Sequence, residues 1–118
     1  MSEWGDIRQR YLRDGVDIRL GGLAANLARI GSFSRRPEHG GAVSRLIRES
    51  ALFIEWTAPD VPEEALPELA ELQRLLSGWY HSWSDVWRDD LHRSAIGETA
   101  GKWSARVLEL SGLGRRDV

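Results

Sequence analysis

The chain has 118 residues, no cysteine, and a formal net charge of −2 from 16 basic and 18 acidic side chains. A chain of this length builds one hydrophobic core, and the absence of thiols excludes disulfides, cysteine nucleophiles and cysteine-ligated metal sites. The nearly balanced charge does not favour nucleic acid as a partner, and no segment reaches the ~20 apolar residues that span a bilayer. Since the amino terminus also lacks the apolar stretch of a secretory signal, we expect a single cytoplasmic domain over residues 1–118.

The first third of the chain predicts two helices that meet at a glycine. Apolar residues recur at intervals of three and four rather than two, which is typical of helices. The apolar stripes before and after Gly15 point about 150° apart at 100° per residue, so one straight helix cannot bury both. We expect a first helix over about 3–14, a break at Gly15, and a second helix that ends near Ser34 and has Asp17 as its N-cap. The first helix has Trp4, Ile7 and Tyr11 on one side; the second has a buried stripe of Val16, Leu20, Leu23, Leu27 and Ile30, beside a ledge of small residues, Gly21, Ala24, Ala25, Ala28 and Gly31.

The segment SRRPEHGG, residues 34–41, predicts a loop because it combines a proline, paired glycines and charge. A third helix follows and ends near Thr57. Leu52 and Trp56 form an apolar i, i+4 pair on the side opposite its buried face, bordered by Arg45 and Glu49. Either a neighbouring helix or a partner protein covers this pair. The buried face of the third helix is formed by Val43, Leu46, Ile47, Phe53 and Ile54.

The second half of the chain predicts two more helices with a bend between them. Pro59 and Pro62 separate the third helix from the fourth, with Asp60 as a cap and Pro67 in the first turn. The apolar faces of the fourth and last helices differ by more than half a turn, so the chain bends between about 82 and 90. A capping box of Ser82 and Asp85 and a cap at Asp89 or Asp90 are both compatible with this bend. The fourth helix carries a heptad seam of Leu69, Leu72, Leu76, Trp79, Trp83 and Val86, and the last helix, to about Ser111, has a face of Ile96, Thr99, Trp103, Val107 and Leu110.

Three tryptophans, Trp79, Trp83 and Trp87, recur at a spacing of four at the end of the fourth helix. Because this row continues the leucine seam in the same phase, we interpret it as interior packing. Large indoles need small neighbours in a close-packed core. We therefore expect the ledge on the second helix and a ridge of Gly97, Gly101 and Ala105 on the last helix to receive them. The alternative is a pocket in which the three indoles stack on a flat ligand such as a tetrapyrrole or a nucleotide.

No catalytic motif is present: the sequence has no serine nucleophile elbow, Walker loop, dinucleotide fingerprint or HExxH helix. His81, Asp85 and His92 would share one helix face only if the helix ran straight through the bend. Asp89 and His92 have the carboxylate-x-x-His spacing of helical metal sites, but no second helix repeats it. We expect these side chains to face solvent, and we expect no metal and no cofactor. An Arg–x6–His pattern from Arg74 to His81 matches the loose signature of HEPN-type ribonucleases, which gives a further enzymatic alternative.

Three stretches carry a resemblance to a group of known proteins. LAANLARIGSFS, LFIEWTAP and WSARVLELSGL resemble segments of short all-helical cyanobacterial proteins that have no assigned activity, over about residues 20–113. The resemblance implies a bacterial cytosol and transfers no functional residue.

Together these patterns predict an all-α protein, a four- or five-helix antiparallel bundle. We expect it to be non-enzymatic and to act through contacts with another protein, as an assembly, adaptor or regulatory factor, with homodimerisation as one form of that contact. The predicted contact residues are Leu52, Trp56 and Arg45 on the third helix and Gly97 and Gly101 on the last.

Overall fold

The computed structural model describes residues 3–112. Over this range the chain is helical and contains no strand, which confirms the all-α prediction. The α-helices are α1 (Glu3–Leu12), α2 (Val16–Phe33), α3 (Gly40–Thr57), α4 (Leu66–His81), α5 (Trp83–Val86) and α6 (Asp90–Ser111), and short 3-10 helices cover Pro37–His39, Ala58–Asp60 and Glu63–Ala65.

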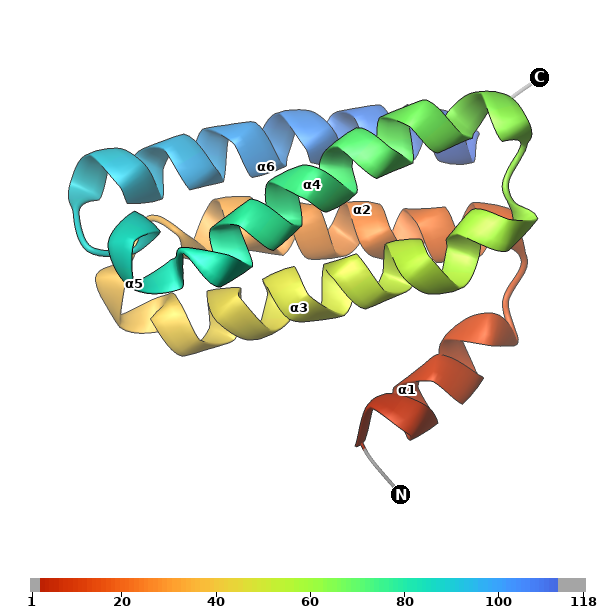
Figure 1. The fold of residues 1–118 in the computed structure, drawn as a ribbon, viewed down its shortest axis with the longest axis horizontal. Helices are drawn as coiled ribbons and strands as arrows, with labels where there is room; N and C mark the ends of the chain where they lie inside the picture. The colour runs from red at the N-terminus through yellow and green to blue at the C-terminus, as the bar shows by residue number, and fades with distance from the viewer. Residues whose placement is uncertain (1–2, 113–118) are drawn as a thin grey trace.

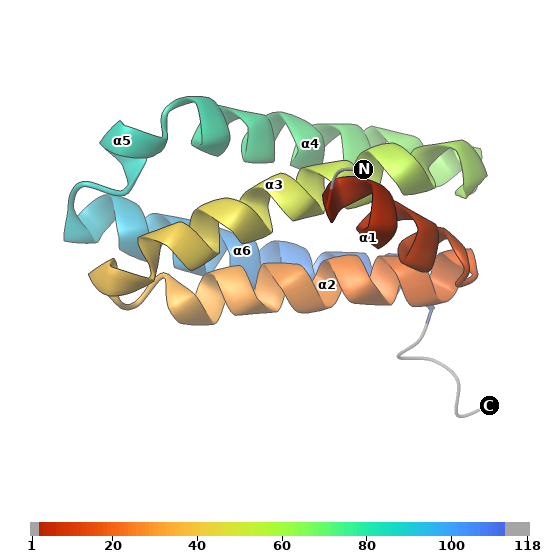
Figure 2. The same ribbon diagram turned by 90° about the horizontal axis from the view of Figure 1, so that it is seen from below.

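Four long helices, α2, α3, α4 and α6, form an antiparallel bundle (Figure 1). α2 and α6 lie side by side along most of their length, and Figure 2 shows α4 on the opposite side of the bundle. α4 crosses the bundle diagonally in Figure 1. The short helix α1 packs on the outside of α3. α2 and α6 therefore form one side of the bundle, and no described helix covers that side.

The core is built from the apolar stripes that the helical spacing predicts. Leu69, Leu72 and Leu76, the leucine part of the predicted heptad seam, are almost completely buried. The rest of that seam, Trp79, Trp83 and Val86, is only half-buried, and the helix breaks at Ser82 within it. The fully buried core side chains include Leu23, Leu27, Ile30, Val43, Ile47, Leu69, Leu72, Leu76, Ile96 and Val107.

The expected break at Gly15 is present, but the cap differs from the prediction. Gly15 itself is the N-cap of α2, with extended φ −68° and ψ 168°. Asp17 lies inside the first turn, where its Oδ1 accepts a hydrogen bond from the backbone N–H of Ile18 at 2.9 Å. Val16 already has helical geometry, so the helix starts before the carboxylate.

Two other loop expectations are also revised. The predicted loop at 34–41 shortens to a 3-10 turn, and Gly40 begins α3 instead of ending the loop. Asp60 does not cap α4, because α4 begins only at Leu66 and its N-cap is Ala65. The Asp60 carboxylate pairs with the buried Arg19 at 3.0 Å. Pro67 lies in the first turn of α4 as expected.

The expected bend between the fourth helix and the last consists of two breaks in the helical chain. α4 ends at His81, and the four-residue α5 separates it from α6. The Ser82 side chain makes no cap hydrogen bond, whereas Asp89 caps α6 by accepting from the backbone N–H of His92 at 2.9 Å. Of the two capping alternatives that the sequence leaves open, Asp89 is the one used.

A buried polar network joins α1 to the bundle. The Tyr11 hydroxyl donates to the backbone oxygen of Arg19 at 2.7 Å and accepts from the Thr57 hydroxyl at 3.2 Å. Its ring stacks on Phe53, with centroids 3.9 Å apart. Burial raises the pKa of Tyr11 to about 12, outweighing the hydrogen bond from Thr57, which acts in the other direction.

Candidate interaction surfaces

The seam between α2 and α6 is unusually close because it is built from small residues. A Cβ placed on Gly31 or on Gly97 would lie 3.1 Å from the backbone oxygen of the other glycine. Further along the seam, the Ser104 hydroxyl donates to the backbone oxygen of Ala24 at 2.7 Å. The two helix backbones are therefore nearly in contact, which a larger side chain at either glycine would prevent.

A groove of ≈750 Å³ opens beside this seam on the outer side of α2 and α6. Gly101 is exposed in it, and a Cβ added at Gly101 would meet no atom within 4 Å. Both Gly97 and Gly101 of the predicted ridge lie beside Gly31 of α2, but a Cβ added at Gly97 would meet α2, whereas one added at Gly101 would point into open space in the groove. The groove is lined by small residues, among them Ala28, Gly31, Ser94, Gly97, Gly101 and Ser104, with Arg35, Asp90 and Arg93 at one end.

The charged end of the groove is held by Arg93. Its Nη1 donates to the backbone oxygen of Trp87 at 2.7 Å, and its Nη2 pairs with Asp90. The guanidinium also lies over the Trp87 ring, 5.8 Å from the centroid. Arg93 thus links the start of α6 to the segment after α5. Arg35, at the same end of the groove, makes no ion pair within residues 3–112 at the distances that define one.

Two exposed aliphatic side chains that the sequence reasoning did not single out flank the opposite end of this side. Leu108 of α6 is 42% exposed and Ile18 of α2 is 47% exposed. Leu108 follows Gly97 by 11 residues and Gly101 by seven, so all three lie on one stripe of α6. This spacing was visible in the sequence, but α6 has apolar or small residues on several sides, which hid the stripe.

The three indoles at 79, 83 and 87 pack against the core, and each is half-buried. Trp83 and Trp87 stack on each other with centroids 4.9 Å apart. Trp87 Nε1 donates to the backbone oxygen of Pro37 at 2.9 Å. Interior packing therefore describes their contacts, although none of the three is fully enclosed.

The expectation that the two small faces receive these indoles is wrong. The ledge of α2 and the ridge of α6 meet each other at Gly31 and Gly97, because two small faces permit the closest helix approach. The glycine that accommodates an indole is Gly40, where an added Cβ would lie 2.7 Å from Trp87 Nε1. Neither the groove at α2 and α6 nor a smaller one beside Leu20 and Leu110 is lined by any of the three indoles.

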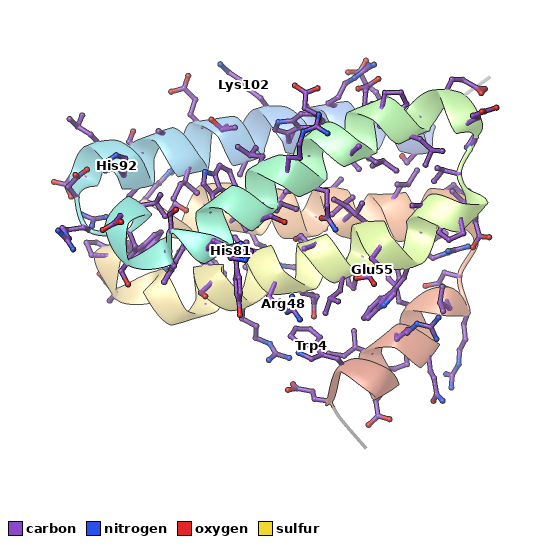
Figure 3. All side chains as sticks on the ribbon, viewed as in Figure 1. Trp4, Arg48, Glu55, His81, His92 and Lys102 are labelled. Atoms are coloured by element: carbon purple, nitrogen blue, oxygen red, sulfur yellow. The ribbon has the colours of Figure 1, made fainter. Side chains whose placement is uncertain are left out.

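The pair Leu52 and Trp56 is half-buried, and α1 accounts for part of its cover. The Tyr11 ring lies 6.0 Å from the Trp56 ring, centroid to centroid. Arg45, which borders the pair, forms a 2.5 Å ion pair with Glu3 and lies over the Trp4 ring at 4.7 Å. Figure 3 shows Trp4 pointing from α1 toward α3. The sequence left open whether a neighbouring helix or a partner protein covers Leu52 and Trp56, and α1 of the same chain covers part of the pair.

The histidines and acids of the second half do not converge. His81 is at the end of α4 and His92 at the start of α6, well apart in Figure 3. His81 Nδ1 contacts the Ser77 backbone oxygen at 2.8 Å, and His92 Nδ1 contacts Asp89 at 2.9 Å. The backbone N–H of His92 is the main cause that lowers the pKa of Asp89. Among residues 3–112 no three His, Cys, Asp or Glu side chains are grouped to hold a metal ion.

Arg74 and His81, the residues of the HEPN-like pattern, both lie exposed on α4. Neither lines the groove at α2 and α6 or the smaller one beside Leu20 and Leu110. Of the helices within 3–112, none is both long and apolar enough to cross a membrane. Comparison with known proteins gives no match: no family model, no curated protein and no solved structure corresponds significantly to this chain.

Proposed function

We propose that this protein acts through protein–protein contacts, as an assembly, adaptor or regulatory factor, and that the contact surface is the outer side of α2 and α6. We call this surface the α2–α6 face. It consists of Asp17, Gly21, Ala25, Ala28 and Ser32 on α2, of Arg35 in the turn after α2, and of Ser94, Gly97, Gly101, Ser104 and Leu108 on α6.

The observation that carries the proposal is the open backbone at Gly101. The α2–α6 face combines a hollow floored by glycine and alanine with an exposed leucine. A side chain from a partner would reach the α6 backbone there without displacing any atom of this chain. Burying one such Leu or Ile side chain contributes roughly 1.5–3 kcal/mol. Small residues also permit an incoming helix to approach closely.

The charge distribution along this face also supports a protein partner. Between Asp17 at one end and Arg35 and Asp90 at the other, the face presents mainly glycine, alanine and serine. Glu98 at the edge of the groove is paired with Lys102 at 3.4 Å. A surface poor in charge at its centre and charged at its ends resembles the composition of protein interfaces.

Site-specific photo-cross-linking tests the proposal. A photoreactive phenylalanine analogue at position 101 projects from the α2–α6 face, and the same analogue at Gly78 is a matched control, because Gly78 is also exposed with no atom near an added Cβ. We expect protein adducts from position 101 in the cells that make the protein, and few from position 78. Equal yields from the two positions, or no adduct from position 101, would refute the proposed surface.

A further inference from the structure

We infer that the partner on the α2–α6 face is a second copy of this chain, packed with its helices antiparallel to those of the first. The inference rests on the proposed function and names its partner. The two copies are related by a twofold axis that runs across α2 and α6 at the middle of the face. α2 then packs over α2 of the second copy, and α6 over α6.

The shape of the face is complementary to itself under this operation. Gly31 lies level with Gly97, and Ala24 is level with Ser104. The middle of the face is therefore near Ala25–Ala28 on α2 and Gly101–Ser104 on α6. A half-turn about an axis at this level exchanges the two ends. It brings the exposed Leu108 of each copy over the hollow beside Gly97 in the other.

The same half-turn also pairs opposite charges. Asp17 lies in the first turn of α2, and Arg35 lies in the turn just after its last residue, Phe33, so the two side chains are at opposite ends of the helix. Arg35 also lines the groove. Both side chains are exposed, and neither has an ion pair at the defining distances within 3–112. The half-turn places Asp17 of each copy near Arg35 of the other. A twofold axis along the helices would instead leave Leu108 at the same end of the second copy, away from the hollow beside Gly97.

The size of the face sets the expected strength. An 18-residue helix is about 27 Å long, and two packed helices are about 18–20 Å wide, which gives about 500 Å² of projected area per copy. Stable interfaces bury about 800 Å² per partner, so we expect a weak dimer in the micromolar range.

Sedimentation equilibrium from about 5 to 500 μM, where a micromolar dimer dissociates, tests the inference. We expect wild type to show a monomer–dimer equilibrium. Gly101→Arg should weaken dimerisation at least tenfold while its circular dichroism and melting curve remain those of a folded helical protein. The matched Gly78→Arg variant on α4 should dimerise like wild type.

Charge reversal tests the orientation of the two copies. Asp17→Arg and Arg35→Asp should each weaken the dimer about threefold to tenfold, because each places like charges together across the axis. The double variant should recover most of the wild-type affinity, which a general loss of stability would not produce. Lack of recovery, or a dimer unaffected by Gly101→Arg, would overturn the antiparallel arrangement.

The failure of this inference can be told apart from the failure of the proposed function. A wild-type chain that stays monomeric at the highest concentration overturns self-association. If position 101 nevertheless cross-links to a different protein in cells, the face remains a contact surface and only the identity of the partner is wrong. If neither a dimer nor an adduct forms, both are wrong.

Discussion

Gly31 and Gly97 face each other so closely that a Cβ on either one would lie 3.1 Å from the backbone oxygen of the other. This contact sets the spacing of α2 and α6 and thereby creates the outer groove. Gly101 is another glycine of α6, one turn after Gly97, but a Cβ added there would meet no atom within 4 Å. At Gly97 the lack of a side chain permits close packing against α2, whereas at Gly101 it leaves the backbone of α6 open to the groove.

Alanine at these two positions should have opposite effects on stability. We expect Gly97→Ala to destabilise the fold by about 1–2 kcal/mol, because the seam must open against backbone atoms that cannot rotate away. Gly101→Ala should stabilise it by about 0.5–1 kcal/mol, because alanine is the better helix former and meets no neighbour. Urea denaturation of both variants measures the difference. Equal free energies of unfolding would show that the seam is not close-packed.

A second pair of adjacent glycines tests how the end of the bundle is closed. Gly40→Ala should cost about 1–3 kcal/mol, because the new methyl group overlaps the Trp87 indole. It should also shift the tryptophan emission to the red as the indole is displaced toward solvent. Gly41→Ala is the control, since nothing lies within 4 Å of its added Cβ. A Gly40→Ala protein with wild-type stability and emission would mean that Trp87 does not rest on α3.

The Tyr11 hydroxyl predicts a loss of stability at alkaline pH. Its pKa is about 12 in the fold and 10.0 without perturbation, so the unfolded chain loses this proton first as the pH rises. The contribution of the neutral hydroxyl is complete below pH 10 and disappears between about pH 10 and 12. The slope there is at most about 1.4 kcal/mol per pH unit.

Tyr11→Phe isolates this effect. The variant should lose about 1 kcal/mol at neutral pH, because the hydroxyl no longer bonds to Arg19 and Thr57. Its unfolding free energy should then fall less than that of wild type between pH 9 and pH 11, measured by urea melts. Parallel pH profiles for the two proteins would contradict the assigned burial of Tyr11.

The start of α6 depends on Asp89. Asp89→Ala should lower the melting temperature, because the N–H of His92 loses its acceptor, whereas Asp89→Asn should retain most of the cap. Since the pKa of Asp89 is lowered in the fold, the carboxylate contributes above its ordinary pKa and loses its effect as the pH falls through the lowered value. The melting temperatures of wild type and Asp89→Ala should therefore converge in acid. A constant difference down to pH 2 would argue against this cap.

Much of the fold followed from helical spacing alone. The opposed stripes on either side of Gly15 and of residues 82–90 required breaks there, because a straight helix has only one inner face. Both breaks are present. The N-cap of α2 could not be inferred in this way, since Gly15 and Asp17 are both acceptable at an N-cap and the choice depends on where the chain turns.

The candidate surface was less accessible to sequence reasoning. Small residues on two helices predicted a close contact, but the spacing could not say whether they face an indole or each other. Which surface the small residues face depends on which helices are neighbours in the fold, and α2 packs mainly against α6. The exposure of Leu108 could not be predicted from the sequence either, because the exposure of a single leucine depends on the neighbouring helices and not on the helix that carries it.

The central claim is that the α2–α6 face is covered in the working protein, and thiol labelling tests this most directly. The natural chain has no cysteine, so Gly101→Cys and the control Gly78→Cys each supply a single reactive thiol. We predict that a maleimide reagent modifies position 101 at least tenfold more slowly inside the producing cells than in dilute purified protein. The control position 78 should be modified at a similar rate in the cells and in the purified protein. Unhindered labelling of position 101 in the cells would contradict the account.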